Sequence, residues 1–182
     1  RKYGVELLKE HRLDCRGLNP VLEKSCDLLP TEAGEPTIIL HGDMPLLSVA
    51  DLDQVLRMTA QSAGLVIGCD RFSKGTNLLA FEPAARPRFA FGINSCDKHR
   101  YTASEAGIPV SIVRTMGIGF DVDEPGDLAL LIAELTSDSQ GQTAKLLLQS
   151  ELRQRIEMLS QSIENNTTDN NGSDQTGEGI AL

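Results

Sequence analysis

Acidic side chains stand at two places where a predicted buried strand ends. Asp43 follows the apolar run Thr37–Leu40, and Asp121 and Asp123 follow a second predicted strand end at Gly119–Phe120, far downstream. If the chain stays extended there, residues two apart point to the same side, so Asp121 and Asp123 face one site. Ligands of open α/β sheets bind beyond the carboxyl ends of the strands, and carboxylates there can hold a divalent cation that holds phosphates. We therefore expect these three carboxylates to bind a metal, and the chemistry to be metal-assisted reaction of a nucleotide. Taken singly, Asp43 also fits an ordinary turn and Asp123 a helix cap.

Two glycine-bearing loops have the composition of anion sites. The loop 73–77 leads into a strand, and its Lys74, Thr76 and backbone amides could meet a phosphate or carboxylate, although many turns share this composition. The loop 91–95 leads into a helix, where free amides and the helix dipole favour negative charge. Ser95 would add a hydroxyl there, but simple capping of the helix explains it equally well.

Two further polar side chains lie near these loops in the sequence. Asn19 could hydrogen-bond a base or a ribose, or cap the helix that it opens, and the residues alone favour the cap. His99 comes one helical turn after Ser95, and a position facing the site is as compatible with the sequence as one facing solvent. The residues thus predict a metal site and an anion site, but no particular reaction.

Short apolar runs alternate with helical patterns along the chain, and these elements must position the candidate residues. The expected strands are Thr37–Leu40, Gly64–Cys69, Asn77–Phe81 and Val110–Val113. The expected helices are Tyr3–His11, Leu18–Leu29, one capped by Ser48 with Asp51, Cys96–Ala106 capped by Ser95, and Glu124–Leu135 capped by Asp123. This alternation predicts a three-layer α/β domain with a mostly parallel sheet.

The chain of 182 residues is most simply one domain followed by a tail. We expect an α/β domain at 1–136, a helical extension at 137–163, with an amphipathic helix over 139–163, and a disordered acidic tail at 164–182. Because the chain opens at Arg1 without a methionine, inside an apparent helical stretch, we expect it to be N-terminally incomplete.

Composition restricts the partners. The net charge of −9 argues against a nucleic-acid-binding surface, which requires clustered Lys and Arg. No apolar run approaches the length of a membrane span, and no signal peptide is visible. The four cysteines lack metal-ligand spacing, so we expect free thiols in a reducing cytoplasm. The sequence leaves the oligomeric state open, and a homodimer is one of the alternatives.

Five motifs occur in an order that resembles the phosphoenolpyruvate or 2-phospho-L-lactate guanylyltransferases of coenzyme F-420 biosynthesis. The motifs are Gly-Leu-Asn, Gly-Asp-x-Pro-Leu, Gly-Thr-Asn, Phe-Gly-x-x-Ser and Asp-x-Asp-x-Pro-x-Asp-Leu. The resemblance runs from about Gly4 to Leu135, and the Gly-Thr-Asn and Phe-Gly-x-x-Ser pair is its most particular part. It implies the GT-A-like nucleotidyltransferase fold.

The resemblance also implies a reaction and its residues. A phosphate oxygen of a small phosphorylated three-carbon acid (phosphoenolpyruvate, 2-phospholactate or 3-phosphoglycerate) would attack the α-phosphorus of GTP and expel pyrophosphate. Such a transfer depends on positioning and charge neutralisation rather than on a protein nucleophile. The implied ligands of the acid are Thr76, Gly92 and Ser95, with Lys74 and Asn19 as further substrate-binding candidates, and those of Mg²⁺ are Asp43, Asp121 and Asp123.

The chain departs from the family pattern at three places. Ile93-Asn94-Ser95-Cys96 replaces Pro-Gly-Ser-Phe, and Asn94 is expected to preserve the turn because asparagine tolerates left-handed backbone. Ser73 stands where glycine is frequent, and the family's N-terminal strand and nucleotide loop have no counterpart before Arg1. The alternatives are a related nucleotidyltransferase of the molybdopterin or sugar-phosphate type, or an inactive module that binds ligands or partners.

Overall fold

The computed structural model describes residues 5, 7–28, 35–137, 139, 141–148, 151–159 and 161. The chain forms two compact units, Arg1–Asp121 and Val122–Leu182. The predicted division into domains stays a prediction, and the predicted tail at 164–182 lies outside the described residues. None of the helices in the described part has the length and apolarity needed to cross a membrane.

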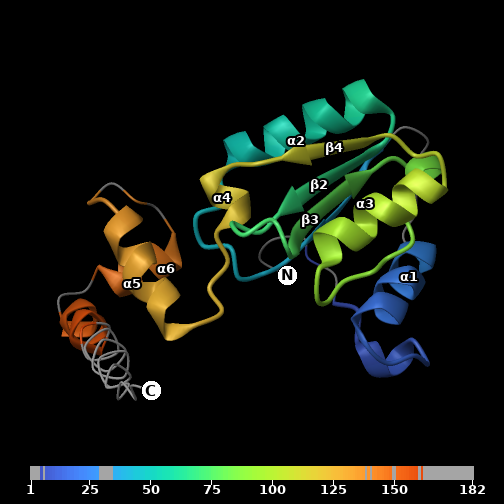
Figure 1. The fold of residues 1–182 in the computed structure, drawn as a ribbon. Helices are drawn as coiled ribbons and strands as arrows, with labels where there is room; N and C mark the ends of the chain where they lie inside the picture. The colour runs from blue at the N-terminus through green and yellow to red at the C-terminus, as the bar shows by residue number, and fades with distance from the viewer. Residues whose placement is uncertain are drawn as a thin grey trace, which may run out of the picture. The chain divides into compact units, whose positions relative to one another are not determined.

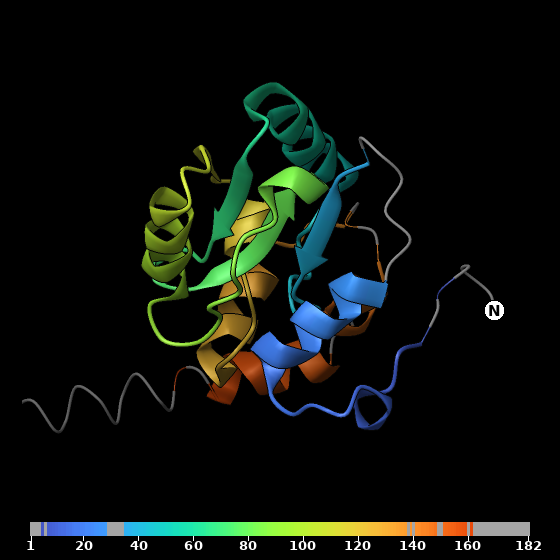
Figure 2. The same ribbon diagram turned by 90° about the vertical axis from the view of Figure 1, so that its right-hand side faces the viewer.

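A four-stranded sheet forms the centre of the first unit, in the order β1-β3-β2-β4 (Figures 1 and 2). Each strand agrees with its predicted position to within one residue. The bounds are β1 Thr37–Leu40, β2 Leu65–Cys69, β3 Thr76–Phe81 and β4 Val110–Val113. β2 and β3 are buried along their whole length, as continuous apolar runs require, whereas β1 lies at an edge and is only half-buried.

The sheet is mixed, so the prediction of a mostly parallel sheet is wrong. β2 and β4 run parallel, but β3 is antiparallel to both of its neighbours, β1 and β2. The reason lies in the connection between β2 and β3, which consists of residues 70–75 only. Parallel neighbours need a crossover of a dozen or more residues, so a connection this short joins antiparallel strands.

Helices cover both faces of the sheet, which confirms the predicted three layers (Figure 1). On one face, Cys96 and Ala103 of α3 and Leu22 of α1 pack against the apolar side chains of β2 and β3. On the other face, Val55 of α2 and Ile118 of α4 meet the opposite side of the same strands. The helices of this unit are α1 Leu18–Leu28, α2 Val49–Ser62, α3 Ser95–Glu105 and α4 Met116–Gly119, with short 3-10 turns η1 at Glu10–Arg12 and η2 at Pro83–Ala85.

The prediction of an N-terminal helix at Tyr3–His11 is wrong for the described residues of that range. Residues 7–9 are not helical, and only the single turn η1 follows them. Leu7 and Leu8 are exposed, so no packing of an apolar face compensates for the cost of ordering an isolated short helix.

One helix has the N-cap residue that was predicted for it, and two helices have a different one. Ser48 caps α2 as predicted, and in addition it forms a reciprocal capping box with Asp51. α3 is capped by Asn94, in the left-handed conformation, and not by Ser95, because Ser95 already lies in the first turn. In the second unit, α5 is capped by Glu124 and not by Asp123.

The second unit contains α5 Pro125–Glu134, α6 Gln142–Leu147 and a helical segment at 151–159. Asp127 accepts hydrogen bonds from the backbone amides of Asp123 and Glu124, both at 2.9 Å, and so fixes the entry into α5. Within the predicted helix 139–163, the described residues are helical at 142–147, 151–159 and 161, with Leu147 and Ile156 buried.

Candidate functional site

The ends of β2 and β4 lie at the same end of the sheet. The helix α4 and the beginning of α3 lie beside them (Figure 1). Asn77, the second residue of β3, makes the central contacts. Its carbonyl oxygen accepts from the amide of His41, 3.0 Å away, and its Nδ2 donates to the carbonyl oxygen of Ile118, also at 3.0 Å. These bonds fix the segment after β1 and the end of α4 on either side of β3.

The turn 70–75 between β2 and β3 is organised by Asp70. The Asp70 amide donates to the Gly75 carbonyl oxygen at 3.1 Å, and the Asp70 carboxylate accepts from the Lys74 amide at 2.7 Å. Ser73 adopts left-handed backbone, with φ 58°, which explains why glycine suits this position. The turn therefore holds Lys74 and the start of β3, with Thr76, in a defined place.

This turn is tied to the first turn of α3. The Cys96 amide donates to the Lys74 carbonyl oxygen at 3.0 Å, and Cys96 forms a disulfide with Cys69, with a Cα–Cα distance of 5.9 Å. The expectation of free thiols is wrong for these two cysteines, because the fold brings together residues that are 27 positions apart. Cys15 and Cys26 are free. The predicted anion loops thus lie against one another.

The loop 91–95 forms a tight turn. Gly92 has φ 121°, which only glycine adopts readily, and Asn94 has φ 56°, as expected from its tolerance of left-handed backbone. The Ser95 amide donates to the Gly92 carbonyl oxygen at 3.0 Å. Because the amides of Ser95 and Cys96 both have backbone acceptors, the start of α3 offers an anion fewer free donors than the sequence suggests.

Asn19 holds this loop rather than capping a helix. It lies in the first turn of α1, which begins at Leu18. Its Oδ1 accepts from the Phe91 amide at 2.8 Å, and its Nδ2 donates to the Phe91 carbonyl oxygen at 3.2 Å. The structure therefore brings Asn19 to the loop that carries Gly92, and its amide group orients that loop.

Thr76 and Ser95 are both 2% exposed, and a histidine joins their elements. His99, completely buried, has its Nδ1 at 3.0 Å from Thr76 Oγ1, and its Nε2 accepts from the Ala90 amide at 2.9 Å. Burial lowers the pKa of His99 to about 4, and a hydrogen bond with the Ser95 backbone acts in the opposite direction. The sequence alone was equally compatible with a His99 side chain that faces the site and with one that faces the solvent.

A hollow of about 260 Å³ opens at the ends of β2 and β4 and is partly cationic. Arg71 and Arg114 line it together with Asp70 and Ser73. The Arg71 guanidinium lies over the ring of Phe120, 5.1 Å from its centroid. Sequence reasoning overlooked both arginines, because isolated surface arginines carry no motif. They supply local positive charge in a chain with a net charge of −9.

The surroundings predicted for two of the metal carboxylates are wrong, because Asp121 and Asp123 follow the helix α4 and not the end of a strand. Asp43 is exposed, Asp121 is half-buried with its carbonyl oxygen 3.4 Å from Arg71 Nη1, and Asp123 belongs to the second unit. No group of three His, Cys, Asp or Glu side chains able to hold a metal occurs in the part of the chain that the structure describes. The role of these carboxylates in metal binding stays a prediction.

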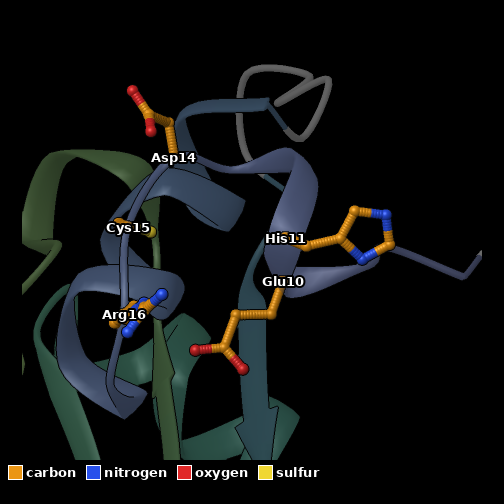
Figure 3. A pocket seen from close by; sticks show the side chains of 5 residues that line it. All are labelled: Glu10, His11, Asp14, Cys15 and Arg16. Carbon is orange, nitrogen blue, oxygen red and sulfur yellow. The ribbon is translucent and has the colours of Figure 1, made fainter.

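A second hollow, of about 670 Å³, lies near η1 and is lined by Glu10, His11, Asp14, Cys15 and Arg16 (Figure 3). The side chains of Glu10, His11 and Asp14 point in different directions (Figure 3). Because catalysis and metal binding need convergent groups, this hollow is a weaker candidate than the end of the sheet.

Comparisons with known proteins agree on one family. The sequence model of a family described as "Guanylyl transferase CofC like" matches residues 1–162. The "Phosphoenolpyruvate guanylyltransferase" of Conexibacter woesei is 38% identical over 108 residues, which cover 59% of this chain and 48% of that protein. The protein of the same name from Rubrobacter xylanophilus is 32% identical over 117 residues, covering 64% and 57% of the two chains.

A third relative carries a different name. The "3-phospho-D-glycerate guanylyltransferase" of Colwellia psychrerythraea is 27% identical over 129 residues, which cover 71% of this chain and 60% of that protein. The chain spans about half the length of the curated relatives it matches.

Proposed function

The chain belongs to the family of CofC-like guanylyl transferases, and on this premise we propose that it transfers GMP from GTP to a small phosphorylated three-carbon acid. A phosphate oxygen of the acid attacks the α-phosphorus of GTP. The bond between the α-phosphorus and the bridging oxygen breaks, and pyrophosphate leaves with that electron pair. The GT-A-like nucleotidyltransferase fold and a role in coenzyme F-420 biosynthesis are part of the same proposal.

The observation that carries this proposal is the junction of the two loops at the end of the sheet. Thr76 and Ser95 lie on elements joined by the Thr76–His99 hydrogen bond, the Lys74–Cys96 backbone hydrogen bond and the Cys69–Cys96 disulfide. Hydroxyls, a glycine turn and nearby cations suit an acid that carries both a phosphate and a carboxylate. A rigid arrangement of this kind positions the acceptor, which is the main protein contribution to phosphoryl transfer.

We assign the acid to Thr76, Gly92 and Ser95, with Lys74 at the rim of the site. Lys74 is exposed on the turn 70–75, so its ammonium can approach a charged ligand from solvent. Asn19 acts on this site through Phe91 and the loop that follows it. Names of the relatives favour phosphoenolpyruvate or 3-phosphoglycerate as the acid.

Magnesium is the proposed cofactor. The donor chemistry fits, because carboxylate oxygens are the ligands that Mg²⁺ prefers. Asp43, Asp121 and Asp123 would hold it, and the ion would neutralise charge on the phosphates of GTP. A cytoplasmic location, the absence of nucleic-acid and membrane partners, and a homodimer stay predictions.

The proposal is tested by incubating the full chain with GTP, Mg²⁺ and each of the three acids, and measuring pyrophosphate release. Release should require one acid and Mg²⁺. The Asp43→Asn protein should release at least about 100-fold less, as expected when a charged group that interacts with the transition state is neutralised. The matched control is Asp53→Asn, which removes an exposed carboxylate on α2 and should leave the rate unchanged.

Each outcome has a definite meaning. Release that needs an acid and is lost only in Asp43→Asn supports the transferase and names its acceptor. Equal loss in Asp43→Asn and Asp53→Asn would point to general charge effects and contradict the specific role of Asp43. Absence of release with every acid would overturn the proposed reaction for this chain.

A further inference from the structure

The hydrogen bonds around His99 determine which nitrogen of its ring carries the proton. The Ala90 amide can only donate, and it lies 2.9 Å from Nε2, so Nε2 must be the unprotonated nitrogen. The low pKa of about 4 means that the ring is neutral at physiological pH. A neutral imidazole with a free Nε2 carries its proton on Nδ1.

The direction of the next hydrogen bond follows from this tautomer. The Nδ1–H proton faces both Thr76 Oγ1, 3.0 Å away, and the Ser95 backbone, and a protonated Nδ1 cannot accept, so the Thr76 hydroxyl can only be an acceptor toward this ring. Its own proton therefore points elsewhere. Among the residues that the structure describes, no acceptor for that proton is recorded, although Thr76 is 2% exposed. A buried hydroxyl without an acceptor costs folding free energy, which a ligand oxygen at this position would restore.

We propose that His99 is a positioning residue that turns the Thr76 hydroxyl into a hydrogen-bond donor for the phosphate or carboxylate of the acceptor acid. This inference rests on the proposed function, which assigns the acid to Thr76. This chain of hydrogen bonds, which we call the relay, runs from the Ala90 amide through the imidazole to Thr76 Oγ1 and on to an oxygen of the acid. Because an ionised acid accepts hydrogen bonds and cannot donate them, a fixed donor favours it over a neutral ligand that needs an acceptor.

The same ring also couples the two loops of the site. Ala90 precedes the loop 91–95, and the edge of the imidazole meets the Phe91 ring with centroids 4.8 Å apart. Removal of His99 could therefore weaken binding by loosening this loop, without any effect on Thr76. A test must separate the donor to Thr76 from the acceptor for Ala90.

Two substitutions make that separation. His99→Gln places an amide oxygen near the position of Nε2, where it can accept from Ala90, but it removes the donor to Thr76. His99→Asn places an amide nitrogen near the position of Nδ1, where it can donate to Thr76, but it does not reach Ala90. We would measure binding of phosphoenolpyruvate to the full chain by calorimetry, and pyrophosphate release in parallel.

Loss of one hydrogen bond to a charged ligand weakens binding by about 10- to 100-fold. We expect this loss in His99→Gln and in Thr76→Val, whereas His99→Asn should stay within about threefold of the wild type. In the Thr76→Val background, His99→Gln should have no further effect, because the two changes remove the same donor. Thr59→Val is the matched control, since Thr59 is also buried and bonded, but to Val55 within α2.

A spectroscopic measurement on the wild-type protein tests the relay even if a variant fails to fold. Nitrogen-15 NMR of the imidazole should show a protonated Nδ1 and an unprotonated Nε2 between pH 6 and pH 8. The opposite tautomer would overturn the inference, because Thr76 would then donate to His99 and not to the acid.

The binding results separate this inference from the proposed reaction. Binding of phosphoenolpyruvate with the expected variant pattern, but without pyrophosphate release, would overturn only the reaction. Wild-type affinity in His99→Gln, additive losses in the double variant, or no binding of any of the three acids to the wild type would overturn the inference.

Discussion

Asn19 and Phe91 lie 72 positions apart and exchange two hydrogen bonds through one side-chain amide. The Phe91 amide donates to Oδ1, and Nδ2 donates to the Phe91 carbonyl oxygen, so the asparagine satisfies both backbone groups of a buried residue. This arrangement resembles one rung of a β-ladder, made by a side chain. It fixes the backbone immediately before Gly92, which is a proposed ligand of the acid.

Replacement of Asn19 by leucine should loosen this loop. Leucine has a similar volume but offers neither a hydrogen-bond acceptor nor a donor. The buried amide and carbonyl of Phe91 therefore lose their hydrogen bonds, at a cost of about 1–3 kcal/mol in the free energy of unfolding. The KM for the acid should rise, while the KM for GTP should stay the same. Denaturant unfolding and steady-state kinetics check both parts. Pro20→Ala, an exposed change next to it on α1, is the control, and equal effects of the two would contradict the role of Asn19.

The stability of the protein should fall as the pH drops below about 6.5. His99 has a pKa of about 4 in the folded chain, against 6.5 for an unperturbed ring, because burial disfavours its charged form. The unfolded chain therefore binds the proton first as the pH falls. The contribution of His99 to the free energy of unfolding is complete above pH 6.5 and lost at about pH 4. It amounts to about 3 kcal/mol at most.

Denaturant unfolding between pH 7 and pH 4 checks this dependence. The His99→Gln protein should have a shallower decline, because the titrating group is gone. His11→Gln removes an exposed histidine and should retain the wild-type decline. Identical curves for all three proteins would show that other groups cause the acid sensitivity.

Reduction of the disulfide should destabilise the first unit. Cys69 and Cys96 are separated by 27 positions, and closing a loop of this length lowers the entropy of the unfolded chain. The chain-entropy model gives about 3–4 kcal/mol for such a loop. Thermal unfolding with and without dithiothreitol should reveal this difference, and the Cys69→Ser protein should match the reduced wild type. Cys15→Ser, which changes a free thiol, should still respond to the reductant.

Gly117 should not tolerate alanine. A Cβ at this position would collide with the Asp51 carboxylate and lie 2.8 Å from the Leu46 carbonyl oxygen. Because Asp51 forms the capping box of α2, the added methyl would strain both α2 and the segment after β1, at a cost of about 1–3 kcal/mol. Gly126→Ala in α5 is the control, since a Cβ there meets nothing within 4 Å. Equal thermal stability of the two variants would refute this argument.

The sequence predicted the strands of the fold well but not their direction. Apolar β-branched runs such as Thr37–Leu40 mark strands wherever they pair, so their positions depend on local pattern alone. Strand direction depends on connections. The turn 70–75 is too short for a crossover, and recognising this would have predicted that β3 is antiparallel to β2. The short N-terminal helix failed because its apolar residues find nothing to pack against.

At the site, motifs predicted the loops but not the contacts between them. Gly92 and Asn94 have the positive φ angles that their residue types suggest. The bonds of Asn19 to Phe91 and of His99 to Thr76 join residues distant in sequence, and pairings of this kind leave no local pattern. The same holds for Cys69 and Cys96, whose spacing matches no known motif.

The disulfide also encloses the proposed acceptor site within one covalent ring. Lys74, Thr76, Gly92 and Ser95 all lie between Cys69 and Cys96. In an oxidised chain these residues therefore cannot diffuse apart, even when the sheet is unfolded, and they meet at the effective concentration of a short tether, on the order of millimolar. After denaturation, the oxidised protein should consequently recover its acid-binding loops faster than the reduced protein recovers them.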